Sequence, residues 1–202
     1  CVPSRYAIFT GKFPARAGVP GRSYNLAPDD VTFATALQSA GYATFFAGKW
    51  HLSKSVDVEP QNMGFDINIA GGAAGAPGSY FHPYNESRSR WHKTAAPLRG
   101  LDEGEADEYL TDRLTRETVA WLRRHQAENP GQPVLAVLSH YAVHTPLEAP
   151  EQDVARFERK LATHPVSGPE FADRDGTTKL QQDHPVYAAM VHRMDASLGR
   201  LL

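Results

Sequence analysis

Cysteine is almost absent from this sequence, because Cys1 is the only one among 202 residues. A single cysteine cannot form a disulfide within the chain, so cysteine usage does not show whether the compartment is oxidising. By composition alone, a lone cysteine is as often a small core residue as a functional group. The role of Cys1 must therefore be inferred from the residues around it.

Long apolar runs and an excess of one charge are also lacking. No apolar run reaches the roughly 18 to 20 residues that span a bilayer, and no leader with a charged and then an apolar part precedes Cys1. The formal net charge is -2 with both signs interspersed, which gives no basic stripe for nucleic acid and no basic amphipathic helix for a membrane surface. We therefore expect no nucleic-acid partner and no membrane span in this segment.

Enough apolar side chains are present for a folded core, since 41% of the residues are hydrophobic and 10% are aromatic. The expectation is one globular α/β unit, without an internal repeat or a linker between domains. The first residue is not Met, and the last predicted helix reaches the end of the sequence. We therefore expect an internal piece of a longer chain, truncated at both ends.

In the first stretch of the chain, the run SRYAIFTG, which follows Pro3, predicts a short helix. Pro3 lies where first-turn prolines are favoured, and Gly11 ends the helix. Cys1 is then at the helix N-terminus, where free amides and the helix dipole favour negative charge. Arg5 follows one turn later with a rigid fork of donors.

The rest of the chain predicts alternating helices and strands. The expected elements are a helix over 31–40 capped by Asp29 or Asp30, a buried strand over 42–48, a long irregular segment over 53–104, a helix over 107–126, a strand over 133–141 covered on both faces, a helix over 151–161 and a helix over 184–202. The last helix has apolar residues at helical spacing: Tyr187, Met190, Val191, Met194, Leu198 and Leu201. This alternation favours an α/β fold with a mostly parallel sheet and helices on both faces.

Residues that can carry a positive charge follow both predicted strands. Lys49 and His51 come after the first strand, and His140 and His144 come after the second. Ligands of open α/β sheets bind beyond the carboxyl ends of the strands. Together with Arg5, these residues predict an anion site, and phosphate or sulfate esters are the leading ligands.

Simpler interpretations apply to several of these side chains. His140 is expected to be structural, and Trp50 is expected to pack and fix its loop. Pro146 interrupts any helix that would place His140 and His144 at metal-binding spacing. The remaining histidines are expected on the surface: His82, His92, His125, His164, His184 and His192.

Two motifs carry a resemblance to a known family. CVPSR, with the trailing TGKFP, resembles the first signature of type I, formylglycine-dependent sulfatases, and GYATFFAGKWHLS resembles the second, in the same order and spacing. GFDINIAGGAAGAPGSYFHPY, EYLTDRLTRE and SHYAVHTPL resemble further stretches of arylsulfatase A-like enzymes. The resemblance extends over 1–202 and implies an alkaline phosphatase-like sandwich, present as a single partial catalytic domain.

The resemblance also implies a chemistry, in which a formylglycine-generating enzyme oxidises Cys1 to formylglycine and its hydrate attacks a sulfate monoester. Each matching residue then has an implied role. Arg5 holds the hydrate, Lys49 binds a sulfate oxygen, His51 is the base for the second step, and His144 contacts the ester oxygen and helps to protonate the leaving alcohol. One calcium ion is implied as well. The modified Cys1 is the one ligand expected in this chain, so we expect the isolated piece to be inactive.

The alcohol half of the substrate stays open, as either an aryl or a carbohydrate sulfate. Side chains suited to both occur between about 70 and 100: Tyr80, His82, Tyr84, Arg88, Arg90 and Trp91. One alternative function is a formylglycine-dependent phosphodiesterase or phosphonate monoester hydrolase. Another is a non-catalytic binding protein with the same fold. The family resemblance favours an exported protein, in the periplasm, the lysosome or outside the cell.

Overall fold

The computed structural model describes residues 1–18, 26–84, 98–172 and 177–202. Its helices are α1 (Val2–Thr10), α2 (Phe33–Ser39), α3 (Leu110–Glu128), α4 (Glu151–Thr163) and α5 (Pro185–Leu201). Its strands are β1 (Ala43–Gly48), β2 (Ile67–Ile69) and β3 (Val134–Ser139), and two short 3-10 helices, η1 (Val56–Val58) and η2 (Pro60–Asn62), lie between β1 and β2. This alternation of helices and strands confirms the predicted α/β class.

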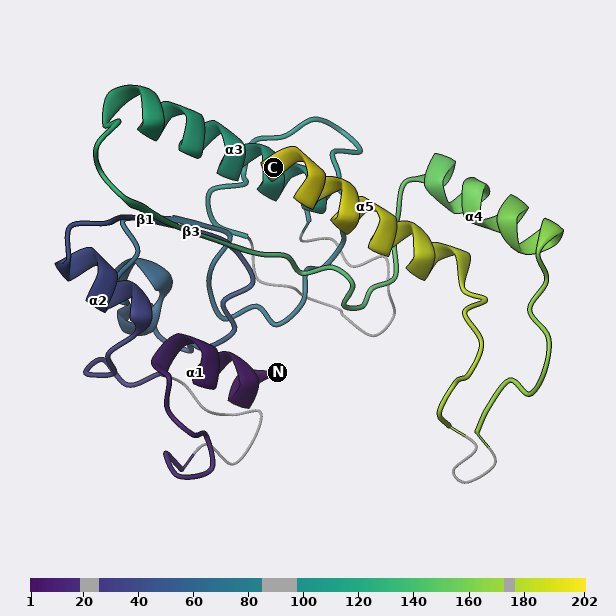
Figure 1. Cartoon of the computed structure of the whole chain (residues 1–202), viewed down its shortest axis with the longest axis horizontal. Helices are drawn as coiled ribbons and strands as arrows, with labels where there is room; N and C mark the ends of the chain where they lie inside the picture. The colour runs from purple at the N-terminus through teal and green to yellow at the C-terminus, as the bar shows by residue number, and fades with distance from the viewer. Residues whose placement is uncertain (19–25, 85–97, 173–176) are drawn as a thin grey trace.

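The described strands form one parallel sheet in the order β2-β1-β3. Phe45 of β1 lies opposite Ile67 of β2 and Ala136 of β3. Helices α1 and α2 lie on one face of the sheet, and α3 with α5 beside it lies on the other, while α4 packs against α5 (Figure 1). Helices on both faces of a parallel sheet were predicted, and the carboxyl ends of the strands consequently meet at one edge.

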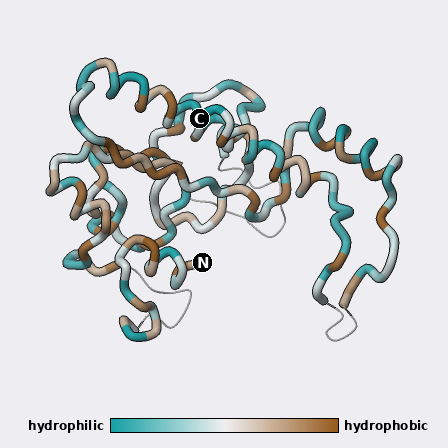
Figure 2. Tube along the Cα trace, viewed as in Figure 1, coloured by the Kyte–Doolittle hydropathy of each residue, from teal (hydrophilic) through white to brown (hydrophobic). Residues whose placement is uncertain are grey.

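Two apolar cores lie on opposite faces of the sheet, because successive side chains of β1 point to opposite sides. Phe45 stacks on Trp121 of α3, with ring centroids 4.8 Å apart. Phe46 instead meets Trp50 at 5.3 Å and Phe65 at 5.2 Å. Figure 2 shows the most hydrophobic residues concentrated along the strands. Full burial of one such ring contributes about 1.5 to 3 kcal/mol, so both cores hold the helices firmly against the sheet.

The predicted N-terminal helix and its end are both confirmed, although the helix begins two residues before the predicted stretch. Helix α1 begins directly after Cys1, which is its N-cap residue, and has Pro3 in its first turn. Gly11 follows the helix with φ 66, in the left-handed region, and its amide donates to the carbonyl of Ala7 at 2.9 Å. Cys1 therefore lies where the prediction placed it.

The cap of α2 differs from the prediction of Asp29 or Asp30. Thr32 is the N-cap, and its hydroxyl accepts a hydrogen bond from the Thr35 amide at 3.1 Å. The Thr35 hydroxyl in turn accepts from the Thr32 amide at 2.7 Å. Asp30 forms an ion pair with Lys12 at 2.5 Å instead. The reciprocal threonine pair satisfies two amides at once, which a single carboxylate cap does not.

Two expectations about strands were also incomplete. The segment over 53–104 is mostly irregular as predicted, but it contains β2, whose three residues are too few for a pattern to be recognised. Strand β3 was predicted to be covered on both faces, whereas Val134 is 38% exposed. Among the described residues β3 pairs only with β1, so its other side has no neighbouring strand there.

The apolar faces predicted for the two longest helices, α3 and α5, are buried to different extents. Helix α3 buries its predicted apolar face, including Leu114 and Trp121. Helix α5 buries Met190, but Tyr187 and Leu198 are 45% and 52% exposed, so its predicted face is only partly covered. None of the helices in the described ranges is both long enough and apolar enough to cross a membrane.

Candidate active site

The residues that follow β1 and β3 meet the start of α1 at the carboxyl edge of the sheet (Figure 1). Gly48 and Ser139, the last residues of these strands, lie opposite each other. A Cβ atom at Gly48 would be 2.0 Å from the carbonyl oxygen of Ser139, and φ at Gly48 is 103, so this position requires glycine. The close approach brings Lys49 beside Ser139, whose carbonyl accepts a hydrogen bond from the Lys49 amide at 2.7 Å.

Cys1 and His51, the predicted nucleophile precursor and the predicted base, are in direct contact. The Sγ atom of Cys1 is 3.0 Å from Nδ1 of His51. The amide of His51 donates to the carbonyl of Gly72 at 2.9 Å. A Cβ atom at Gly75 would lie 2.6 Å from Cε1 and Nε2 of the imidazole, so Gly75 leaves the space that the ring occupies. The fold thereby fixes the ring against residue 1.

Arg5 joins α1 to the ends of both strands. Its Nε donates to the carbonyl of Trp50 at 2.6 Å, and its Nη2 donates to the carbonyl of Lys49 and to Oγ of Ser139, the latter at 3.0 Å. These acceptors are uncharged, so the guanidinium keeps its full positive charge. Burial lowers the pKa of Arg5 to about 10, and the side chain is still a cation at neutral pH.

The pKa values of Lys49 and His51 are lower than those of the free side chains, because both residues are buried near other cations. Burial, and secondly the charge of Arg5, lower the pKa of Lys49 to about 8. Burial lowers the pKa of His51 to about 4, and the charges of Lys49, Arg5 and His144 act in the same direction. At neutral pH the site therefore holds cations beside a neutral imidazole, and the field at Cys1 favours an anion.

His144 lies on the loop after β3 and is exposed. Its carbonyl accepts a hydrogen bond from the hydroxyl of Tyr80 at 2.9 Å, and its amide donates to the carbonyl of Tyr141 at 2.9 Å. Its Nδ1 is 2.9 Å from the carbonyl oxygen of Thr145. A carbonyl oxygen only accepts hydrogen bonds, so this contact, which is shorter than the 3.3 Å between Nδ1 and Oγ1 of Thr145, favours the tautomer with the proton on Nδ1. The nitrogen that exchanges a proton with a bound ligand is therefore Nε2.

The structure thus brings Cys1, Arg5, Lys49 and His51 together, with His144 close enough to affect the pKa of His51. The sequence interpretation did not identify Ser139 or Tyr80 as supports of this site. A polar residue at the end of an otherwise apolar strand was the available signal for Ser139. No sequence signal distinguishes Tyr80 from the other tyrosines.

Two other histidines show where the sequence interpretation succeeded and where it failed. His140 forms a hydrogen bond from the end of β3 to α5, with Nε2 2.8 Å from Oγ of Ser197, in agreement with a structural role. His125 was expected on the surface, but it is only 9% exposed and stacks on Trp121 at 5.4 Å. Its Nε2 is 3.2 Å from the carbonyl oxygen of Gln132. Its position on the inner face of α3 explains the difference.

The exposed positions expected of the other histidines hold for His164 and His184, whereas His82 and His192 are partly buried. His184 also caps α5, and its Nδ1 accepts from the Tyr187 amide at 3.3 Å. His92 lies outside the described residues.

The aromatic side chains proposed to contact the alcohol half of the substrate do not all face solvent. Tyr80 and Tyr84 are both 0% exposed, and the hydroxyl of Tyr84 donates to a carboxylate oxygen of Glu108 at 2.5 Å. These two tyrosines belong to the core, so that part of the prediction was wrong. Arg88, Arg90 and Trp91 lie outside the described residues.

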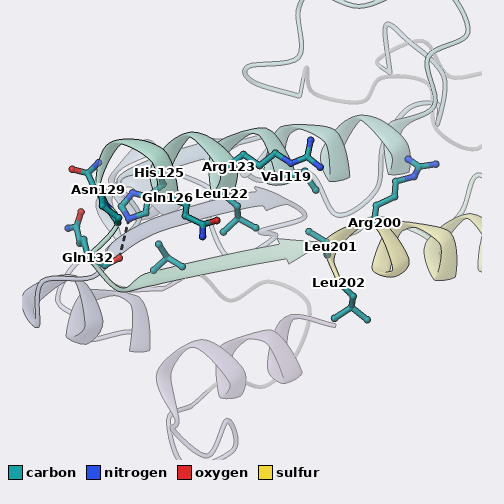
Figure 3. A pocket seen from close by; sticks show the side chains of 12 residues that line it. Val119, Leu122, Arg123, His125, Gln126, Asn129, Gln132, Arg200, Leu201 and Leu202 are labelled. Atoms are coloured by element: carbon teal, nitrogen blue, oxygen red, sulfur yellow. Dashed lines mark hydrogen bonds between the residues drawn. The ribbon is translucent and has the colours of Figure 1, made fainter.

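A pocket of about 530 Å³ lies beside β3, between the second half of α3 and the end of α5. Figure 3 shows Leu122, Leu201 and His125 among the side chains that line it. Arg200 in this lining pairs with Asp112 at 2.9 Å, and Nε2 of His125 is 3.2 Å from the carbonyl oxygen of Gln132. Its lining contains none of the predicted site residues, so we place the candidate active site at Cys1.

Comparison with known proteins finds relatives that match the whole chain. A family model described as Sulfatase matches residues 1–202. An uncharacterized sulfatase of Escherichia coli, YdeN, is 27% identical over 99% of this chain and 34% of its own length. An arylsulfatase of Klebsiella aerogenes is 28% identical over 99% of this chain and 51% of its own length. The chain therefore spans between a third and about half of the length of these relatives.

Solved structures of similar proteins identify the fold. The crystal structure of Ps i-CgsB is 26% identical, with a TM-score of 0.69 over 100% of this chain and 43% of that one. A second crystal structure, of Ps i-CgsB in complex with k-i-k-neocarrahexaose, is 27% identical, with a TM-score of 0.68 over the same shares of the two chains. The predicted alkaline phosphatase-like fold is confirmed.

Proposed function

The chain belongs to the sulfatase family, and we propose that the protein hydrolyses sulfate monoesters with a nucleophile formed from Cys1. The observation that carries this proposal is the 3.0 Å contact between Sγ of Cys1 and Nδ1 of His51. Arg5 and Lys49 lie beside this contact, and among the described residues neither forms an ion pair with a carboxylate. A sulfate ester supplies the negative charge that this group of cations lacks.

Conversion of Cys1 to formylglycine gives this position its chemistry. Cys1 is exposed, so a formylglycine-generating enzyme has access to its side chain. A hydrated aldehyde offers two hydroxyls on one carbon: one attacks sulfur and displaces the alcohol, and the other then forms the carbonyl while sulfate leaves. A serine at this position lacks the second hydroxyl and would stop after the first step.

Lys49 and Arg5 would bind and orient the sulfate group. Lys49 is buried and retains its charge below about pH 8, so its ammonium is suited to hold a sulfate oxygen and to offset charge that develops during transfer. Arg5 holds the carbonyls of Lys49 and Trp50 and thereby fixes the loop that carries both Lys49 and His51. Its remaining donor capacity would serve the hydrate on residue 1.

His51 would accept the proton of the second hydroxyl. Its Nδ1 faces residue 1, and its pKa of about 4 keeps the imidazole neutral near pH 7. A neutral imidazole within hydrogen-bond reach is the form that a general base requires.

His144 would protonate the oxygen of the leaving alcohol. Because Nδ1 is engaged by the carbonyl of Thr145, Nε2 is the nitrogen that would donate this proton. An alcohol that leaves as a poor anion depends on such a donor, whereas an activated phenol does not.

A calcium ion is implied by the family, and the modified residue 1 is the ligand that this chain would provide. The side chains that surround it in the described ranges are Arg5, Lys49 and His51. No three His, Cys, Asp or Glu side chains in those ranges are grouped so that they could hold a metal ion. These residues do not fit a complete calcium site, and none of the steps above depends on one.

We propose a carbohydrate sulfate as the first substrate class to test. The support is the crystal structure of Ps i-CgsB, which is 27% identical and contains a neocarrahexaose. Relatives also include an arylsulfatase, so aryl sulfates are the necessary comparison.

The test is hydrolysis of a carbohydrate sulfate, an aryl sulfate and an aryl phosphate diester by the full-length protein, matured with a formylglycine-generating enzyme. We expect sulfate monoesters to be cleaved with the higher kcat/KM. A higher kcat/KM for the phosphate diester would replace this proposal with a phosphodiesterase.

A further inference from the structure

The hydroxyl of Tyr80 links the loop that carries His144 to the protein core. This hydroxyl donates to the carbonyl oxygen of His144 at 2.9 Å. Tyr80 is 0% exposed, its ring lies 5.8 Å from that of Tyr109, and its carbonyl accepts from the Leu110 amide at 2.8 Å. The donor is therefore held by a rigid part of the fold.

The other hydrogen bonds of His144 stay within its own loop. Its amide bonds to Tyr141, three residues earlier, and its imidazole bonds to the carbonyl of Thr145, the next residue. Neither bond attaches His144 to another element. In the ranges that the structure describes, the Tyr80 hydroxyl is thus the hydrogen bond that ties this residue to the core.

A second connection holds the far end of the same loop. A carboxylate oxygen of Glu148 accepts from the hydroxyl of Ser79 at 2.8 Å and from the amide of Tyr80 at 2.7 Å. The loop is thereby attached at two points, His144 and Glu148, to the consecutive residues Ser79 and Tyr80. An attachment of this kind limits how far the backbone at His144 can move.

We propose that Tyr80 is a positioning residue for His144, which it places within reach of the leaving-group oxygen. This inference rests on the function proposed above. Proton donation requires a heavy-atom separation of about 2.6 to 3.2 Å, and a displacement of about 1 Å can lower the rate about 100-fold. Loss of the Tyr80 hydroxyl would free the His144 backbone while the imidazole itself remained intact.

Tyr109 provides a matched control for Tyr80. It is also a buried tyrosine, and its hydroxyl donates to the carbonyl of Glu148 in the same loop, likewise at 2.9 Å. Burial raises the pKa of both hydroxyls, so both remain protonated donors. The two bonds differ in the residue that they hold, since only Tyr80 holds His144.

The experiment compares Tyr80→Phe, Tyr109→Phe and His144→Ala in the matured full-length protein. We would measure kcat/KM for a series of aryl sulfates with leaving groups of increasing pKa, together with a carbohydrate sulfate, and Tm for every variant. Tyr80→Phe should lose less than about twofold on the most activated ester and about 10-fold to 100-fold on the poorest. Tyr109→Phe should show a similar fall in Tm. Its loss of kcat/KM should be small and the same for every ester in the series.

The outcomes separate this inference from the function on which it rests. If His144→Ala shows the expected dependence on the leaving group but Tyr80→Phe lowers all rates equally, Tyr80 is structural and the inference is wrong. If the wild-type protein does not cleave sulfate esters, the proposed function is wrong. If His144→Ala lowers all rates equally, the role of His144 as a proton donor is wrong. Should Tyr80→Phe not fold, Glu148→Ala releases the same loop from Ser79 and from the Tyr80 amide but keeps the bond between the Tyr80 hydroxyl and His144. Its leaving-group dependence should then match that of the wild type, and a dependence as steep as that of His144→Ala would show that the Tyr80 hydroxyl does not position His144.

Discussion

Lys49 carries its charge in a buried position next to Arg5, an arrangement that is unfavourable until an anion binds. Among the described residues Lys49 forms no ion pair, and its pKa of about 8 reflects burial and the neighbouring guanidinium. Folding has already removed water from around this cation, so a bound anion interacts with it strongly. We expect this effect to be the same for every sulfate ester, because the sulfate group is common to all of them.

Lys49→Ala should therefore lower kcat/KM by a similar factor across a leaving-group series. The loss of one preorganised cation at a transferring group corresponds to about 3 kcal/mol, or about 100-fold. Steady-state kinetics with nitrophenyl sulfate, phenyl sulfate and a sugar sulfate measure this factor. A loss confined to the poorest leaving groups would show that Lys49 acts on the alcohol and not on the sulfate.

His144→Ala should behave differently, because a proton donor matters only where the leaving alcohol needs one. The loss should exceed about 100-fold for a sugar sulfate and stay below about tenfold for a nitrophenyl sulfate. The same kinetic series checks this prediction. An equal loss on all esters would reduce His144 to a further sulfate-binding group.

Single residues also show which parts of the site a sequence can predict. Cys1, Arg5, Lys49 and His51 fall within two continuous signatures, so their approximate meeting place could be predicted. Their supports could not be, because these depend on which hydroxyl reaches which carbonyl across the fold. Tyr80 is an example, since the sequence placed it with substrate-facing aromatic residues and the structure buries it completely.

At the scale of secondary-structure elements, local chemistry predicted the helices better than it predicted their ends. The end of helix α1 was correct because Gly11 acts within the last turn, whereas the helix begins at Val2, two residues before the predicted stretch. The cap of α2 was assigned to the wrong residue because three candidates, Asp29, Asp30 and Thr32, are crowded into four positions. Pairing with Lys12 across the fold decided the position of Asp30.

Thr32→Ala should consequently destabilise the protein by about 1 kcal/mol, the usual effect of removing a helix cap. Its hydroxyl also donates to the carbonyl of Met63 at 2.7 Å, which adds to the loss. Asp29→Ala at the exposed neighbouring position is the matched control and should change the free energy of unfolding by less than about 0.5 kcal/mol. Urea unfolding of both variants measures the difference, and equal effects would contradict the assignment of the cap.

His140 makes the contact between β3 and α5 sensitive to pH. Burial lowers its pKa to about 4 in the folded state, against about 6.5 for a free histidine. The unfolded chain thus binds the proton more readily than the folded one, and stability is fully present above about pH 6.5 and is lost as pH falls toward 4. The total change is at most about 3 kcal/mol.

The free energy of unfolding measured between pH 7 and pH 4 tests this expectation. His140→Gln retains a donor toward Ser197 but has no titrating group, so its stability should fall less than that of the wild type over the same range. Parallel curves for the two proteins would show that other groups cause the pH dependence.

At the scale of the whole molecule, the parallel sheet explains why residues far apart in the sequence form one site. Strands β1 and β3 run in the same direction and are adjacent, so the segments after both strands lie together, and α1 supplies the third side through Arg5. The sequence predicted this arrangement from the alternation of helices and strands. It could not predict that β3 has only one neighbour among the described residues, because an apolar run does not show how many strands flank it.

The central claim for the whole protein is that Cys1 is the precursor of the nucleophile, and the mass of its peptide tests this most directly. The active, full-length protein would be digested, and the peptide that contains Cys1 would be analysed by mass spectrometry and by reaction with a hydrazide. We predict a peptide lighter by the difference between thiol and aldehyde, which reacts with the hydrazide in proportion to sulfatase activity. A fully active protein whose Cys1 remains an unmodified thiol would contradict the account.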